Sequence, residues 1–161
     1  MAGGDIETYL LEKSRVTYQS PNERSYHIFY FMITHKVDLH DTCKLTDDIY
    51  DYPLMSMGKV TVDSIDDVEE MQIMDEAFDI LGFTKEEKYN VYKISSMCMI
   101  LSKLEFVGHG DITTAKSLDA GQTLVDMFGY CEAPDELYDR FSNPKIKVNY
   151  FDYCFFGYLM S

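Results

Sequence analysis

The chain has 161 residues, of which 28 are Asp or Glu and 14 are Lys or Arg, so its formal net charge at pH 7 is −14. This balance argues against a nucleic-acid-binding protein and against a polybasic membrane-binding protein, because both need clustered Lys and Arg. Hydrophobic residues make up 46% of the chain, which excludes a compositionally disordered protein. The length predicts one compact domain and is too short for two independent cores.

No apolar run approaches the ~18 residues that a transmembrane helix requires. The first residues hold neither a basic nor an apolar region, so no signal peptide is expected. Four cysteines are spaced widely, and in a chain without an export signal they are expected to be reduced thiols. Composition alone predicts an acidic cytosolic protein and names no function.

The expected elements are short helices with brief connections. The segment Asp5–Val16 mixes β-forming residues with charges, and its periodicity fits a strand or a helix. Ser20, Pro21 and Glu23 match a capping box with proline at the first helical position, which predicts that a helix begins there. Apolar and aromatic side chains follow on most sides of this helix, so we expect it to be buried nearly all round.

Lys59–Val62 has the residues of a short strand. Ser64–Asp67 then begins a helix that we expect to end at Gly82, with Phe83 packing back on the last turn. Its first turn is crowded with Asp and Glu, which the helix dipole favours. The order of these acids does not match an EF-hand loop, so a solvated helix start is preferred over a cation site.

Thr84–Glu87 forms a second capping box and predicts another helix. Four apolar residues at helical spacing predict its inward face: Val91, Ile94, Met97 and Leu101.

The rest of the chain is punctuated by glycine and proline. Val107–Asp111 contains two glycines and is expected to be a loop. A helix is expected over residues 114–128, with Gly129 as its stop, and a short one from Pro134 to Pro144. Residues 145–148 fit a strand.

Catalytic motifs are absent. A phosphate-binding P-loop needs G-x-x-x-x-G-K-[ST], whereas the only Gly-Lys pair, Gly58–Lys59, has Val60 after it and Pro53 where the first glycine belongs. Gly108–Gly110 is only a fragment of a dinucleotide-binding motif, and no nucleophile elbow occurs. The sequence therefore predicts no catalytic and no nucleotide-binding residue.

Other candidate groups have a simpler structural interpretation. His35, His40 and Cys43 could approach one metal ion, but their spacing matches no zinc pattern, so surface histidines are preferred. His27 lies in an apolar helix and is interpreted as a hydrogen-bonded core histidine rather than a catalytic base. The methionines at helical spacing could form a soft partner groove but are more often core residues: Met71, Met74, Met97 and Met99.

Several ordered segments resemble conventional (class II) myosin heavy chains. Asp5–Val16 reads D-I-E-T-Y-L-L-E-K-S-R-V, and Glu23–Tyr30 follows at the spacing of that family. The similarity continues in three further segments, residues 65–70, 75–84 and 143–148. The variant resembles an invertebrate muscle-type head.

This resemblance implies a fold that is mainly α with a few short strands. It would be a fragment of the α/β myosin motor head, of the P-loop NTPase superfamily, that lacks most of the central sheet. Residues 1–148 would be a partial motor domain that runs from the last transducer strand through much of the upper 50-kDa region. Residues 149–161 match no element of the family and form a divergent aromatic tail.

The resemblance also implies a function. The parent family is an actin-based, ATP-driven cytoskeletal motor that hydrolyses Mg-ATP, but its P-loop, switch I and switch II have no counterpart here. We therefore expect no activity, metal or cofactor in this chain alone. The implied partners are the actin filament and the rest of the head, and the implied location is the cytoplasm, in the myosin complex of muscle thick filaments. The alternative is a stand-alone acidic protein-interaction module.

Glu12, Lys13 and Arg15 match the segment of the family at the junction between transducer and upper 50-kDa region, behind the nucleotide site. The resemblance suggests that they relay changes across this junction, and an ordinary buried ion pair is the equally weighted alternative. Leu101–Leu104 stands where the helix of the family usually continues through an H-x-G-N/E-like turn, and the charged loop that follows is shortened to Val107–Asp111. The actin-binding residues are therefore unknown.

Overall fold

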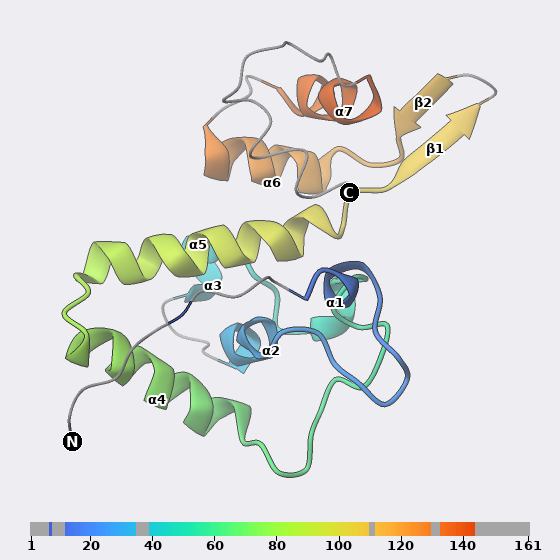
Figure 1. The fold of residues 1–161 in the computed structure, drawn as a ribbon. Helices are drawn as coiled ribbons and strands as arrows, with labels where there is room; N and C mark the ends of the chain where they lie inside the picture. The colour runs from blue at the N-terminus through green and yellow to red at the C-terminus, as the bar shows by residue number, and fades with distance from the viewer. Residues whose placement is uncertain (1–6, 8–11, 35–38, 110–111, 130–132, 144–161) are drawn as a thin grey trace. The chain divides into compact units, whose positions relative to one another are not determined.

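The computed structural model describes residues 7, 12–34, 39–109, 112–129 and 133–143 (Figure 1). These residues are mainly helical, as expected, with one two-stranded sheet. The chain divides into two compact units, residues 1–104 and residues 105–161. The prediction of a single compact domain is therefore wrong, because the second unit buries apolar side chains of its own, including Leu124, Val125, Leu137 and Tyr138.

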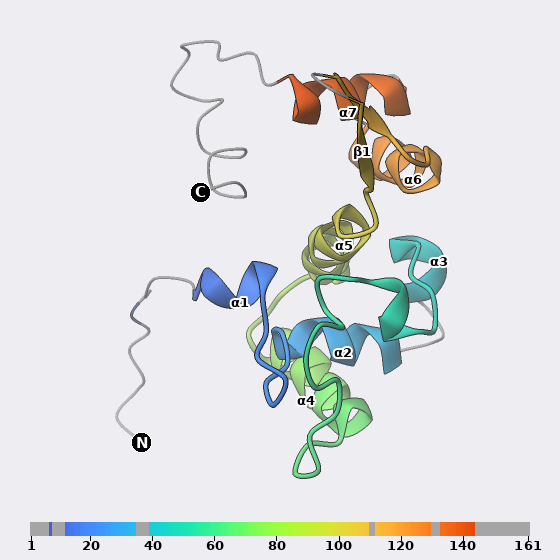
Figure 2. The ribbon, with the colours of Figure 1, turned by 90° about the vertical axis from the view of Figure 1, so that its right-hand side faces the viewer.

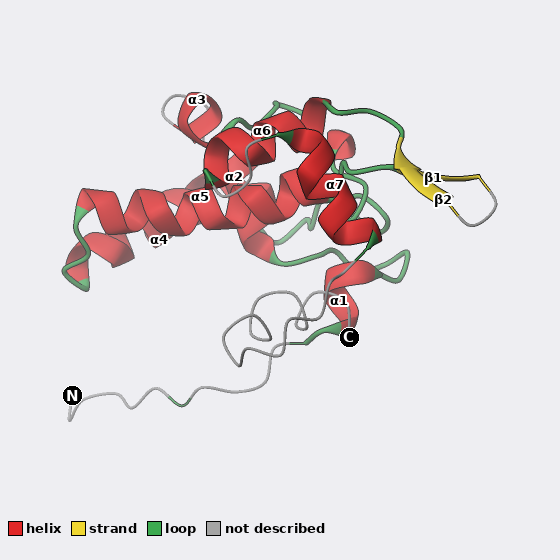
Figure 3. Cartoon of the chain, turned by 90° about the horizontal axis from the view of Figure 1, so that it is seen from above, coloured by secondary structure: helices red, strands yellow, loops and turns green. Residues whose placement is uncertain are grey.

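The first unit is built from five helices and one 3-10 turn among its described residues. Their bounds are α1 Ser14–Thr17, α2 His27–Thr34, α3 Leu39–Cys43, η1 Ile49–Asp51, α4 Asp67–Ile80 and α5 Lys85–Leu101. Helix α2 packs against both α4 and α5, and α3 packs against α5 (Figures 2 and 3). The core lies where these helices meet, and its most deeply buried side chains are Met32, Leu39, Cys43, Tyr52, Met71 and Met99.

Helix α2 begins at His27, so the predicted helix start at Ser20 is wrong. Tertiary contacts hold the preceding residues in a loop: Gln19 Nε2 donates to the Leu54 carbonyl at 2.9 Å, and the Lys59 amide donates to the Glu23 carbonyl at 2.8 Å. Gly58 permits this close approach, because a Cβ there would lie 2.2 Å from the Glu23 carbonyl oxygen. The expected burial of the helix is confirmed for Tyr30–Ile33.

The predicted strand at Lys59–Val62 is also wrong, because these residues have no regular secondary structure. Helix α4 follows, and the Asp66 carboxylate caps it by accepting from the Val68 and Glu69 amides at 3.0 and 3.2 Å. The predicted stop at Gly82 is confirmed by its φ of 82°. Phe83 packs on Phe78 with ring centroids 4.9 Å apart, as expected.

Helix α5 begins with the predicted capping box, in which the Glu87 amide donates to Thr84 Oγ1 at 3.2 Å and the Thr84 amide donates to the Glu87 carboxylate at 2.8 Å. Its predicted inward face is wrong in part, because Val91 is 36% and Ile94 59% exposed, although Met97 is buried. The buried face instead carries Lys88, Tyr92, Ser96, Met99 and Ile100.

The second unit contains a β-hairpin and two helices among its described residues. Their bounds are β1 Phe106–His109, β2 Ile112–Ala115, α6 Asp119–Phe128 and α7 Pro134–Ser142. The strands are antiparallel, with Val107 opposite Thr114. The loop predicted at Val107–Asp111 is therefore largely strand. The helix predicted from residue 114 begins only at Asp119, because the residues up to Ala115 pair with β1 as part of β2. The stop at Gly129, with φ 61°, is confirmed, as is the helix that begins at Pro134.

Aromatic contacts hold the second unit together. The Phe106 ring meets the Tyr138 ring edge-on at 5.2 Å, and the Tyr138 hydroxyl donates to the Ser117 carbonyl at 2.6 Å. Gly121 lets α6 approach α7 closely, since a Cβ there would lie 2.8 Å from the Tyr138 ring.

Some predictions fall on residues that the structure does not describe. These include the strand at residues 145–148, the tail at 149–161 and most of the segment at 5–16, whose described end forms α1. Within the described residues, Cys43 and Cys98 are free thiols. No helix in this part of the chain is long and apolar enough to cross a membrane.

Candidate functional site

The candidate junction residues lie at and just before α1. Arg15 Nε donates to the Glu12 carboxylate at 3.0 Å, so the structure brings these two residues together. This hydrogen bond is the main reason that the pKa of Arg15 is raised above its ordinary value. Lys13 is the exposed residue that precedes the helix. The pair is a partly exposed ion pair rather than a buried one, with the Glu12 side chain 57% exposed.

Further contacts connect this pair to the loop that leads into α2. Arg15 Nη1 donates to the Arg24 carbonyl at 2.8 Å. The Tyr26 hydroxyl donates to the Glu12 carbonyl at 2.6 Å. The same residues border a surface hollow of about 440 Å³, which Ser25, His27 and Val62 also line. These hydrogen bonds connect α1 and the residues just before it to the loop that contains Arg24.

Arg24 is a functional candidate that the sequence analysis missed. Its side chain is 3% exposed and forms two hydrogen bonds with the Asp67 carboxylate at the start of α4, at 2.9 and 3.1 Å. The guanidinium also lies over the Tyr30 ring, 4.6 Å from its centroid. We call this contact the Arg24–Asp67 pair. A buried arginine needs such a partner, because an uncompensated charge in the interior is costly.

The only sequence signal for this pair was an arginine next to a strongly apolar helix. The pair joins the loop before α2 to the first turn of α4, across 43 residues of sequence. Three buried polar atoms in the described residues have no hydrogen-bond partner, and all lie in this loop: Gln19 Oε1, Arg24 Nε and Ser25 Oγ. Gln19, Arg24 and Ser25 are thus buried polar residues of this loop, whereas residues 21–23 between them are exposed.

His27 begins α2 and is exposed, so its interpretation as a core histidine is wrong. Its Nδ1 lies 3.1 Å from Arg24 Nη2. Because the guanidinium can only donate, Nδ1 accepts, and the neutral ring carries its proton on Nε2. Partial burial of the ring and, second, the charge of Arg24 lower the pKa of His27.

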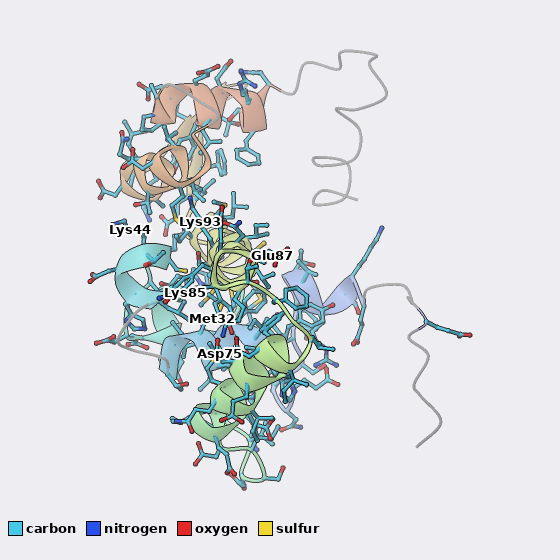
Figure 4. The ribbon with its side chains drawn as sticks, turned by 90° about the vertical axis from the view of Figure 1, so that its left-hand side faces the viewer. Met32, Lys44, Asp75, Lys85, Glu87 and Lys93 are labelled. Atoms are coloured by element: carbon cyan, nitrogen blue, oxygen red, sulfur yellow. The ribbon has the colours of Figure 1, made fainter. Side chains whose placement is uncertain are left out.

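A second polar cluster joins α4 to α5. Lys88 Nζ lies 2.9 Å from both the Asp75 and the Asp79 carboxylates, and the Tyr92 hydroxyl donates to Asp75 at 2.9 Å. Asp75 and the buried Met32 lie between α4 and α5 in Figure 4. Hydrogen bonds to both carboxylates raise the pKa of Lys88, and burial followed by the bond to Asp75 raises the pKa of Tyr92. Lys88 and Tyr92 of α5 thus bind the carboxylates of α4 and tie the two helices together.

His35, His40 and Cys43, which the sequence analysis weighed as metal ligands and interpreted instead as structural residues, are not brought together among the described residues. His40 Nδ1 lies 2.8 Å from the Asp47 carboxylate, and Cys43 is buried with its thiol pKa raised by burial. His35 lies outside the described residues. The described part of the chain contains no group of three or more His, Cys, Asp or Glu side chains that could hold a metal ion.

The methionines are core residues, as expected, for three of the four positions. Met71, Met97 and Met99 are between 0% and 6% exposed, and Met74 is partly buried. A soft partner groove made of these side chains is therefore excluded for the buried three.

The first unit is thus a helical scaffold in which the buried Arg24–Asp67 pair ties the loop before α2 to α4. The sequence of the whole chain matches the model of the myosin head (motor domain) family over residues 1–150 of 161. The chain belongs to this family and carries a fragment of a myosin motor domain. The resemblance noted in the sequence is confirmed at the level of the family.

Proposed function

We propose that this chain is part of the motor head of a conventional (class II), muscle-type myosin, from its upper 50-kDa region. The observation that carries the proposal is the family match over residues 1–150, together with the class II-like segment Asp5–Val16. The head as a whole is an actin-based motor of the P-loop NTPase superfamily that hydrolyses Mg-ATP. This chain supplies scaffold, not chemistry, and has no cofactor and no ATPase activity of its own. Its location is the cytoskeleton, in the thick filament of muscle.

Mass spectrometry of the source tissue tests this proposal. The tryptic peptide of residues 60–85 should be recovered from a large heavy chain that sediments with actin filaments and is released by Mg-ATP. Recovery in isolated thick filaments would support the muscle-type assignment. If the peptide came only from a small protein that stays in the supernatant in both conditions, the proposal would be wrong. That result would favour the alternative, a stand-alone acidic interaction module.

We further propose that Glu12, Lys13 and Arg15 relay changes across the junction behind the nucleotide site. The contacts of Arg15 with Glu12 and with the Arg24 carbonyl support this role, because they couple α1 to the loop before α2. In a complete motor head that contains this segment, the single variants Glu12→Arg and Arg15→Glu should slow actin-activated ATP turnover. The double variant should restore a large part of the rate.

The same exchange at the exposed pair Glu136 and Arg140 serves as the control and should leave turnover unchanged. If the junction variants lower only the melting temperature of the head, while turnover per folded molecule stays the same, the residues stabilise the head and relay nothing.

A further inference from the structure

We propose that His27 and the Arg24–Asp67 pair form a proton-sensitive latch, in which a neutral His27 helps to hold the start of α2 against α4 and a protonated His27 loosens this contact. The proposal concerns a conformational device within the first unit and does not depend on the class of myosin.

The geometry sets the protonation state of the closed latch. His27 Nδ1 lies 3.1 Å from Arg24 Nη2, and the same nitrogen of Arg24 lies 2.9 Å from Asp67 Oδ1. A guanidinium has no acceptor atom, so the contact with His27 is a hydrogen bond only while Nδ1 carries no proton. Protonation converts it into a contact between two donors and places two positive charges side by side.

Neighbouring charges determine how unfavourable the protonation of His27 is. Arg24 from the loop and Arg15 from α1 disfavour a charged His27, whereas Asp67 and Glu70 from α4 favour it. Burial and Arg24 outweigh the two carboxylates, and the pKa of His27 lies below its ordinary value. The carboxylates that favour protonation belong to α4, and one of them, Asp67, is already bound to Arg24. The protonated ring and Arg24 therefore compete for Asp67.

Arg24 has little freedom to escape this competition. Its side chain is 3% exposed and stacks on the Tyr30 ring, so it cannot turn its charge into solvent without leaving the interior. His27 is exposed and can move. We therefore infer that protonation first displaces the His27 ring and with it the first turn of α2, which then loses contact with α4.

The sign of the pH dependence follows from linkage. Since the pKa of His27 is lowered in the folded state, the unfolded or opened state binds the proton more tightly. The stabilisation is complete above the ordinary histidine pKa of about 6.5 and is lost as the pH falls through the lower folded value. The latch is therefore closed at pH 7.5 and weakened at pH 5.0.

Amide hydrogen exchange on the full chain tests the latch locally, with rates corrected for the intrinsic effect of pH. Losing one hydrogen bond of this kind corresponds to about a fivefold change in an opening equilibrium. We expect the protection of α2 and of the first turn of α4 to fall by about that factor between pH 7.5 and pH 5.0. Protection of α7 in the second unit should change much less and serves as the internal reference.

Two variants at the exposed position 27 separate the latch from general acid effects. In His27→Gln the amide oxygen can still accept from Arg24 but does not titrate, so protection should remain high at both pH values. In His27→Lys the charge is permanent, so protection should be low at both. His40→Gln, which removes the histidine paired with Asp47, should keep the wild-type response.

The proposal is overturned if His27→Gln loses protection as steeply as the wild type, or if His27→Lys is as protected as the wild type at pH 7.5. The involvement of Asp67 has its own test. In an Asp67→Asn background the difference between His27→Gln and wild-type His27 at pH 5.0 should shrink. An undiminished difference would show that the proton acts without the Arg24–Asp67 pair.

Discussion

At the scale of single residues, the buried Arg24–Asp67 pair gives a prediction for the stability of the first unit. Asp67→Ala leaves the guanidinium of Arg24 buried without its partner, and breaking such a pair typically costs about 3 kcal/mol or more. We expect this loss in the free energy of unfolding, measured by urea denaturation followed by circular dichroism. Because the Asp67 side chain is 18% exposed, we expect the loss in unfolding free energy to lie at the lower end of the range for buried ion pairs.

A matched exposed pair provides the control for this prediction. Glu136→Ala removes a partner of Arg140 on the surface of α7, and exposed ion pairs contribute about 0–1 kcal/mol. The double variant Arg24→Met with Asp67→Leu should recover part of the loss, because apolar residues avoid the desolvation of the charges. Equal effects of Asp67→Ala and Glu136→Ala would contradict the assignment of Arg24 as buried and dependent on Asp67.

The sequence could not reveal this pair for a physical reason. Arg24 and Asp67 look like ordinary surface charges, because each lies in a polar stretch and their distance in sequence gives no periodic signal. His27 was misinterpreted for the converse reason, since its apolar neighbours suggested burial. Charge pairing across 43 residues depends on tertiary structure, and it is the fold that brings these side chains together.

At the scale of elements, some signals carried by a few consecutive residues were correct, and others were overridden by tertiary contacts. The ends of helices at Gly82 and Gly129 and the capping box at Thr84 were predicted correctly, because caps depend on a few consecutive residues. The start of α2 was wrong because Gln19 and Glu23 bond to the segment around Gly58. The face of α5 was wrong in part, because its buried side includes the polar residues Lys88 and Ser96, which a hydrophobic pattern cannot find.

The capping box of α5 gives a prediction at this scale. Thr84→Ala removes the hydroxyl that accepts from the Glu87 amide and should lower the free energy of unfolding by about 1 kcal/mol. Thr84→Ser keeps the hydroxyl and should stay close to the wild type. Urea denaturation measures both, and hydrogen exchange should place the loss in the first turn of α5. An unchanged Thr84→Ala variant would mean that the cap contributes nothing to stability.

At the scale of the whole molecule, we predict that the chain does not bind nucleotide. Phosphates are bound by backbone N–H groups of a glycine-rich loop and by a lysine that reaches the β- and γ-phosphates, and the sequence holds no such motif. Among the described lysines, Lys88 is already paired with the carboxylates of Asp75 and Asp79. A fluorescent ATP analogue at micromolar concentration should show no saturable change with Mg²⁺. Saturable, Mg²⁺-dependent binding would contradict this prediction.

We also predict that the chain alone does not bind filamentous actin specifically, although its family does. The surface of actin that faces myosin is acidic, as the family resemblance implies, and this chain carries a net charge of −14. Like charges repel within the Debye length, ~8 Å at physiological salt, so encounter is slowed rather than steered. Residues 107–111 contain no Lys or Arg to offset this repulsion.

The two nearest lysines in the sequence are already engaged: Lys103 lies 5.0 Å from the centroid of the Tyr52 ring, and Lys116 forms an ion pair with Glu105. A stable interface buries more than about 1,000 Å², which these two groups cannot supply. Co-sedimentation at low salt is the most demanding test, because screening is weakest there, and we expect no saturable pelleting with actin. The opposite outcome would be pelleting that fades as salt rises and that is abolished by Lys103→Ala together with Lys116→Ala. Such a result would show that the shortened region around the hairpin retains an actin contact.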